Sequence, residues 1–187
     1  SPLGCHPLSM VSRIQCMSFL FWNVQGLGEP DKCDLIRNSI SSASPVVVCL
    51  QESKLASLDV FKARSFLPLY LSEFVTKDAD GSRGGVIMAW DPRKLSLVSC
   101  ARSCFSLTTK LASTVSDLSF SLTNVYAPAD QSLTATFVDD MLSLSPAIDG
   151  ARLIVGGFNL IRLPREKNND RFDASCASAF NAMINAL

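Results

Sequence analysis

Apolar residues fall into short runs separated by glycine, proline and polar turns, and this pattern predicts the first elements. Met17 to Val24 (MSFLFWNV) is an aromatic run ended by glycines, which predicts a buried strand. Asp31 to Ser42 follows Pro30 with apolar residues at helical spacing, which predicts a helix. Pro45 to Leu50 is β-branched and predicts a second buried strand. Together they form a strand–helix–strand unit of the size expected for a parallel crossover.

The remaining chain continues this pattern. Further strands are expected at Gly84 to Trp90, Leu95 to Val98, Phe105 to Leu111, Leu118 to Tyr126 and Leu153 to Val155. Helices are expected at Ser132 to Leu144 and over residues 174–187, where apolar residues recur on one face. No repeat or linker interrupts residues 17–187, so we expect one α/β domain there, preceded by a loose leader at residues 1–16.

Composition narrows the functional classes. The chain has 187 residues, 48% of them apolar, and its 17 basic residues balance 17 acidic ones. This argues against a disordered protein, and against a nucleic-acid binder that depends on a broad positive field. The single histidine is His6. These residues alone therefore cannot support a catalytic mechanism that needs two histidine side chains, or a histidine far from the N-terminal segment.

The cysteines and the absence of targeting signals suggest a compartment. The chain has seven cysteines, an odd number, and their scattered spacing fits free thiols in a reducing environment. No secretory signal is convincing, and no stretch approaches the roughly 20 apolar residues that a membrane span needs. We therefore expect an intracellular protein, nuclear or cytoplasmic, that has no membrane partner and is not secreted.

Polar residues at the ends of apolar strands are the candidates for chemistry, because strand ends open onto clefts. Four places qualify: Asn23, Gln51-Glu52, Asn124-Val125-Tyr126 and Gly156-Gly157-Phe158-Asn159. A carboxylate near a carboxamide suits a hard cation such as Mg²⁺, which needs one or two protein carboxylates and takes substrate phosphate as a further ligand.

Each candidate also has a purely structural explanation. Asn23 and Asn159 could cap turns, and Tyr126 could be a core aromatic at a strand end. Glu52 could serve the electrostatics of a helix start instead of ligating a metal. Taken singly, these residues do not decide between the alternatives.

The ordered set of motifs is more specific. Trp22-Asn23-Val24-Gln25-Gly26-Leu27, Leu50-Gln51-Glu52-Ser53-Lys54, Gly84-Gly85-Val86-Ile87, Asn124-Val125-Tyr126-Ala127-Pro128 and Ile154-Val155-Gly156-Gly157-Phe158-Asn159 occur in that order. Over about residues 17–187 the chain thereby resembles the endonuclease/exonuclease/phosphatase superfamily, and within it the apurinic-like endonuclease domain of plant LINE-type (non-LTR) retrotransposons.

The resemblance implies a fold and a set of roles. The fold would be a two-sheet β-sandwich flanked by helices, a four-layer αββα arrangement of the DNase I type. Members of this family cleave phosphate esters with Mg²⁺ or Mn²⁺. Glu52 matches the metal-binding glutamate of this superfamily, and Asn23 matches the asparagine near the metal and phosphate. Tyr126 and Asn159 match catalytic positions that contact the phosphate or attacking water. Arg162 lies where retroelement members often have a basic residue that meets substrate phosphate.

The sequence departs from the family pattern in two ways. The aspartate expected before Phe158-Asn159 is missing, either replaced by Gly157 or deleted after it. Loss of this general-base position predicts a rate lower by about 10²–10⁴-fold. The closing strand, with its Ser-Asp-His motif, has no counterpart before Leu187, and His6 lies too early to replace the family histidine.

Absent terminal strands would leave a sheet edge open. We therefore expect a domain of reduced stability, monomeric or prone to aggregation, with an apolar patch near Trp22, Val47 and Ile154.

Three functions remain open. The first is a degenerate, inactive nuclease-like domain left by a retroelement. The second is an active Mg²⁺-dependent DNA-nicking fragment whose last motif lies in a longer product. The third is a nucleic-acid or protein-binding module without hydrolysis. Arg162, Arg165, Lys167 and Arg171 could contact phosphates, although nearby acidic residues favour an ordinary solvated loop.

Overall fold

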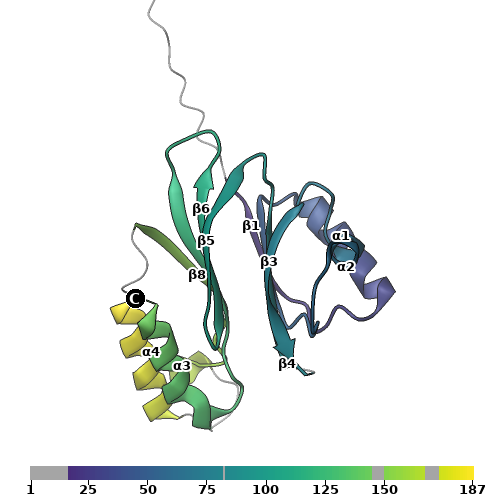
Figure 1. Cartoon of the computed structure of the whole chain (residues 1–187). Coiled ribbons are helices and arrows are strands. Elements are labelled where there is room, and N and C mark those ends of the chain that lie inside the picture. Colours follow the sequence, from purple (N-terminus) through teal and green to yellow (C-terminus); the bar gives the residue numbers. More distant parts are fainter. Residues whose placement is uncertain (1–16, 82, 145–149, 167–172) are drawn as a thin grey trace, which may run out of the picture.

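Two four-stranded sheets packed face to face form the centre of the molecule (Figure 1). The computed structural model describes residues 17–81, 83–144, 150–166 and 173–187. The expected leader at residues 1–16, with His6, and the basic residues Lys167 and Arg171 therefore lie outside the described residues.

The first sheet has the strand order β1-β2-β4-β3. Its strands are β1 (Phe19–Asn23), β2 (Val47–Gln51), β3 (Glu73–Asp80) and β4 (Arg83–Trp90). Strands β1 and β2 are parallel and are connected by α1 (Pro30–Ala43), which confirms the predicted crossover. Pro30 occupies the first turn of α1, where its missing N–H is not needed, and Ser44 ends the helix in a left-handed conformation.

The second sheet has the order β5-β6-β7-β8. Its strands are β5 (Leu95–Arg102), β6 (Ser106–Ser113), β7 (Ser119–Tyr126) and β8 (Ala151–Gly157). The chain passes from β7 to the parallel strand β8 through the short 3-10 helix η1 (Gln131–Leu133) and α3 (Thr134–Ser143). A second 3-10 helix, η3 (Pro164–Glu166), precedes α4 (Ala174–Ala186), whose N-cap Asp173 accepts the N–H groups of Ser175 and Cys176.

Helices cover the outer face of each sheet, which confirms the four-layer αββα architecture (Figure 1). Apolar side chains of α1 and α2 (Val60–Phe66) pack on the first sheet, and those of α3 and α4 pack on the second. A third apolar cluster fills the space between the sheets and includes Val47, Met88, Trp90, Leu107 and Leu122. Among the described residues, none of the helices has the length and apolar character required to cross a membrane.

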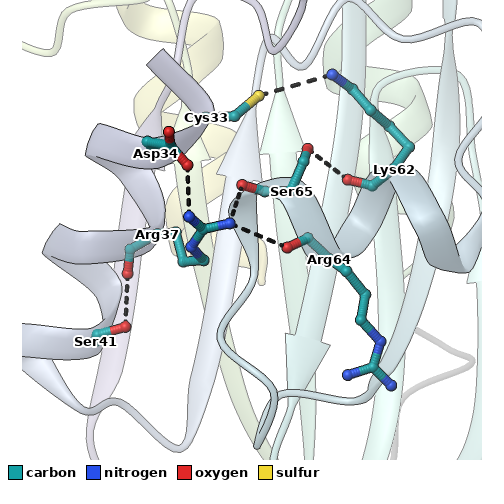
Figure 2. A network of polar contacts seen from close by, with 7 residues as sticks. All are labelled: Cys33, Asp34, Arg37, Ser41, Lys62, Arg64 and Ser65. Atoms are coloured by element: carbon teal, nitrogen blue, oxygen red, sulfur yellow. Dashed lines mark hydrogen bonds and ion pairs between the residues drawn. The ribbon is translucent and has the colours of Figure 1, made fainter. Parts of the chain in front are cut away.

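Polar contacts join α1 to α2 (Figure 2). The Arg37 guanidinium donates to the carbonyl oxygens of Arg64 and Ser65, at 3.4 and 3.0 Å, and pairs with Asp34 on its own helix. Lys62 of α2 donates to the thiol sulfur of Cys33 at 3.7 Å. Arg37 thereby satisfies carbonyls in the last turn of α2, whose first turn is capped by Asp59.

Three expectations about burial need correction. Strand β1, expected to be buried, is an edge strand of the first sheet, and its Phe21 side chain is 39% exposed. Strand β8 is likewise an edge strand with half-exposed residues. Val47, expected in an exposed apolar patch, is completely buried because β2 lies between β1 and β4.

The five cysteines among the described residues are free, as expected: Cys33, Cys49, Cys100, Cys104 and Cys176.

Candidate active site

The predicted polar residues gather at one end of the two sheets. Asn23 is the last residue of β1 and pairs in register with Gln51, the last residue of β2, so Glu52 follows directly beyond that edge. Tyr126 ends β7 and pairs in register with Gly157, the last residue of β8. Each pair belongs to parallel strands, whose carboxyl ends meet at the same sheet edge.

A groove of about 890 Å³ opens between these strand ends. Glu52 from the first sheet and Tyr126 from the second both line it. The other lining residues come from the loop after β2, the β3–β4 hairpin, the β5–β6 turn and the segment before α3, and are Lys54, Lys77, Asp78, Asp80, Gly84, Gly85, Val86, Cys104, Phe105, Pro128, Ala129, Asp130 and Leu133. The structure thus brings two of the predicted site residues onto one concave surface.

Asn23 contacts Glu52 directly. Its Nδ2 donates to Glu52 Oε1 at 2.7 Å, while its Oδ1 accepts the backbone N–H of Gln25 at 3.1 Å. Asn23 therefore caps the turn after β1, as its structural explanation expected, and its side chain also contacts the Glu52 carboxylate.

The backbone around Glu52 is held in an uncommon conformation. Gln25, Glu52 and Lys54 have φ angles of 52°, 54° and 55°, in the left-handed region that non-glycine residues seldom adopt. Backbone bonds maintain it: Gly26 N–H donates to Glu52 O at 2.6 Å, and Ser53 and Lys54 donate to the carbonyls of Gly85 and Gly84. Local strain that is stabilised by its surroundings is typical of functional sites.

Gly85 must be a glycine for these loops to pair. Its φ is +83°, and a Cβ there would lie 2.2 Å from Ser53 Oγ and 3.3 Å from the Ala79 side chain. The Gly84-Gly85 motif therefore allows the start of β4 to approach the loop that carries Glu52.

Two buried carboxamides, Gln51 and Asn124, lie close in sequence to the groove residues Glu52 and Tyr126. Gln51 Nε2 donates to Asn124 Oδ1 at 2.5 Å, so a residue of β2 is bonded to a residue of β7. Asn124 Nδ2 donates in turn to the carbonyl oxygens of Leu50 and Ile87, both at 3.3 Å. These bonds cross from the second sheet to the first.

Asn159 lies away from the groove lining. It has a φ of 51°, and its Nδ2 donates to the carbonyl oxygen of Ala127 at 2.7 Å, next to Tyr126 in sequence. It borders a separate cavity of about 80 Å³, lined also by Gln131, Leu160, Ile161, Asp173, Cys176 and Ala177. The structure therefore connects Asn159 to the site through the backbone after Tyr126, without placing it beside Glu52.

Arg162 is occupied by contacts with α4. Its Nε donates to Asn181 Oδ1 at 2.9 Å, and Asn181 Nδ2 donates to the Arg162 carbonyl at 3.1 Å. Glu166 Oε2 accepts the backbone N–H groups of Arg162 and Leu163. These contacts give Arg162 a structural role, holding the loop after β8 against the last helix.

Gly157 has room for a side chain, unlike its neighbour. A Cβ at Gly157 would meet no atom within 4 Å, and its φ lies outside the left-handed region. A Cβ at Gly156, where φ is +128°, would lie 1.9 Å from the Val125 carbonyl oxygen. Because Gly157 pairs in register with Tyr126, a side chain there would project from the same face of the sheet as Tyr126.

The groove also contains charged residues that sequence reasoning missed. Lys54, Lys77, Asp78, Asp80 and Asp130 line it, and three of them belong to β3, a strand that was not predicted. The backbone N–H of Ser132 donates to Asp130 and lowers the pKa of this carboxyl. Within the described ranges, no three His, Cys, Asp or Glu side chains are grouped closely enough to hold a metal ion by themselves.

Comparisons with solved structures identify the fold. An AP endonuclease from Leishmania major matches with a TM-score of 0.65 and 17% identity, over 91% of this chain and 66% of that one. An AP endonuclease from Archaeoglobus fulgidus matches with a TM-score of 0.65 and 14% identity, over 90% of this chain and 70% of that one. The human Nocturnin catalytic domain, solved with bound sulfate, matches with a TM-score of 0.58 and 18% identity, over 77% and 65%.

These matches show that the chain has the DNase I-like α/β sandwich fold that these nucleases share. The chain spans about two thirds of the length of the structures it matches. No protein-family model matches the sequence, and neither does any curated protein.

Proposed function

We propose that this chain is a metal-dependent phosphodiesterase domain of the endonuclease/exonuclease/phosphatase superfamily, of the kind that nicks DNA for a plant LINE-type retrotransposon, and that its hydrolytic step is severely impaired. The observation that carries the proposal is the groove lined by both Glu52, which follows a strand of the first sheet, and Tyr126, which ends a strand of the second. The neighbouring AP endonuclease structures support it at the level of the fold.

The donor set suits one hard divalent cation. Glu52 supplies a carboxylate, and Asn23, 2.7 Å away, supplies a carboxamide. Mg²⁺ is commonly held by one or two protein carboxylates together with waters and substrate phosphate, so this small set is sufficient. Glu52 and Asn23 would hold Mg²⁺ or Mn²⁺, which would neutralise negative charge on the phosphoryl oxygens.

The remaining residues would orient the phosphodiester. The Tyr126 hydroxyl can donate to a phosphate oxygen in the groove, and Lys54 and Lys77 provide the positive charges of the same lining. Asn159 would act by fixing the backbone after Tyr126, to which it is bonded, and Arg162 by holding the loop that follows.

Impairment follows from the missing acceptor. A general base must lie within hydrogen-bonding reach of the attacking water, and Gly157 presents no side chain beside Tyr126. The space and ordinary φ at Gly157 favour replacement of an aspartate over deletion of one. The same observation favours a second candidate function, DNA binding without cleavage, because the groove is retained while the base is lost.

Nicking of supercoiled plasmid with Mg²⁺ or Mn²⁺ tests the proposal. We expect little nicking by the unmodified chain and a gain of about 10²-fold or more in Gly157→Asp. Gly157→Asn is the matched control, with the same shape and no basic oxygen. Adding Glu52→Ala to Gly157→Asp should abolish the gain. Robust nicking by the unmodified chain would contradict the impairment. The absence of a metal-dependent gain in Gly157→Asp, both alone and with the family's Ser-Asp-His segment added, would contradict the proposed chemistry.

A further inference from the structure

The hydrogen bond between the side chains of Gln51 and Asn124, called the bridge below, joins two polar groups in a buried position between the sheets. Gln51 is 3% exposed and Asn124 is fully buried, and the side chains between the sheets are mostly apolar, with buried Thr109 on the inner face of β6 a further polar one. Burying an amide costs free energy unless its hydrogen bonds are made inside the protein. An apolar pair of similar volume would fill the space without that requirement. Retention of two amides here therefore calls for a role beyond filling the core.

Directional bonding is what the amides add. Apolar contacts between two sheets are non-directional and permit several offsets of one sheet against the other. The Gln51–Asn124 bond and the two bonds from Asn124 to the carbonyls of Leu50 and Ile87 are satisfied in one arrangement. Because Leu50 and Ile87 are register partners on β2 and β4, Asn124 joins β7 to both strands at once.

The bridge is close in sequence to the two groups that line the groove. Gln51 immediately precedes Glu52, and Asn124 precedes Tyr126 by two positions, so that their side chains share one face of β7. Glu52 and Tyr126 belong to different sheets, and their separation depends on how those sheets are offset. Each site residue is thus within two residues of one half of the bridge.

We propose that Gln51 and Asn124 are positioning residues, whose bond holds β2 and β7 at the offset that presents Glu52 and Tyr126 to one bound phosphate ester. The inference rests on the proposed function, because the two groups act together only if the groove binds such a ligand. It predicts that losing the bridge disorders the groove while the remainder of the fold persists.

The same strand provides a matched control. Thr123, next to Asn124, has its Oγ1 2.9 Å from that of Thr108, and both residues are buried. Thr123 points to the opposite face of the sheet from Asn124. Thr123→Val therefore removes a comparable buried hydrogen bond from β7 without touching the contact between the sheets.

Metal-free NMR decides the inference. The chain has two tyrosines, so fluorotyrosine gives two fluorine signals, which Tyr70→Phe assigns. In Asn124→Leu we expect the Tyr126 signal to move and broaden. The amides of Ser53 and Lys54 should exchange about tenfold faster or more relative to β5–β6 amides, as expected for loss of a buried hydrogen bond. Thr123→Val should change neither signal nor relative exchange.

If Asn124→Leu does not fold, Gln51→Met decides, because it removes the bridge and leaves the Asn124 bonds to Leu50 and Ile87. Wild-type behaviour at Tyr126, Ser53 and Lys54 in the folded bridge variant would overturn the inference, and so would equal effects in Thr123→Val.

Added Mn²⁺ tests the proposed function separately. Failure of Mn²⁺ to broaden the Tyr126 signal of the unmodified chain would count against that function, whereas the metal-free results would still decide the positioning role.

Discussion

Two adjacent glycines at the end of β8 differ in what a side chain would meet. Gly156→Ala forces a Cβ to within 1.9 Å of the Val125 carbonyl oxygen, at a φ that L-residues avoid. We expect it to lower the free energy of unfolding by at least about 2–3 kcal/mol. Gly157→Ala meets open space and should change it by less than about 1 kcal/mol.

Urea unfolding of both variants measures this difference. Equal destabilisation would show that β8 ends differently, and it would also remove the reason for expecting Gly157→Asp to fold.

The turn after β4 has a carboxylate whose charge stabilises the folded state. Arg93 donates to both oxygens of the buried Asp91, at 2.9 and 2.7 Å, and this hydrogen bonding lowers the pKa of Asp91. A lowered folded pKa means that stabilisation is complete above the ordinary value of about 4 and is lost as pH falls through the folded value.

Asp91→Asn should therefore reduce the urea midpoint at pH 7, and the difference from wild type should shrink below about pH 4. Asparagine keeps the oxygen that accepts the Arg93 backbone N–H, so the turn itself is preserved. Asp117→Asn, in the exposed β6–β7 turn, is the charge-removal control. A pH-independent difference for Asp91→Asn would contradict the electrostatic explanation.

The strands and helices that the sequence predicted are those with a buried face, because burial produces a recognisable pattern of apolar residues. Strands β2 and β4 are continuous apolar runs because both of their faces are buried, and helices α1 and α4 have apolar residues at helical spacing because one face packs on a sheet. Strand β3 was missed because it is an edge strand in which charged residues dilute the apolar ones. Helix α2 was missed because it is short and begins with two exposed apolar residues, although its N-cap Asp59 was a usable signal.

The candidate site divides in the same way. The positions of Asn23, Glu52 and Tyr126 were predictable because each lies at or directly after the end of a predicted strand. The contacts of Asn159 and Arg162 were not, because they depend on the loop after β8 and on α4. The lysine and aspartates of β3 could not be assigned to the groove without knowing that β3 pairs with β4.

Among the described residues, β1 pairs with β2 alone, and its other edge predicts self-association. This strand is uncharged, it lies at the edge of its sheet, and Phe21 is 39% exposed. Natural edges are commonly protected by a charge or a bulge, and β1 has no charge. Phe21→Lys should reduce association in analytical ultracentrifugation and lower the binding of a hydrophobic dye.

Val98→Lys is the matched control. Val98 lies on β5, which is an edge strand of the second sheet, as β1 is of the first. Val98 is 57% exposed and lies at an irregularity in the β5–β6 pairing, which already disrupts that edge. We expect no change in association from this variant. Equal effects of both substitutions would indicate general solubilisation instead of a specific role for β1.

The charge of the whole molecule predicts how it would hold DNA. Its formal net charge is zero, and the groove lining has two lysines against the four carboxylates of Glu52, Asp78, Asp80 and Asp130. With so few cationic contacts, binding should depend on a divalent cation, and log K should fall with log salt with a slope no steeper than about −2. The proposed impairment of hydrolysis permits this measurement on the unmodified chain with Mg²⁺. Lys54→Ala and Lys77→Ala should each make the slope shallower by about one, while Asp78→Asn with Asp80→Asn should strengthen binding. A much steeper slope that neither lysine substitution alters would place the DNA on another surface of the molecule.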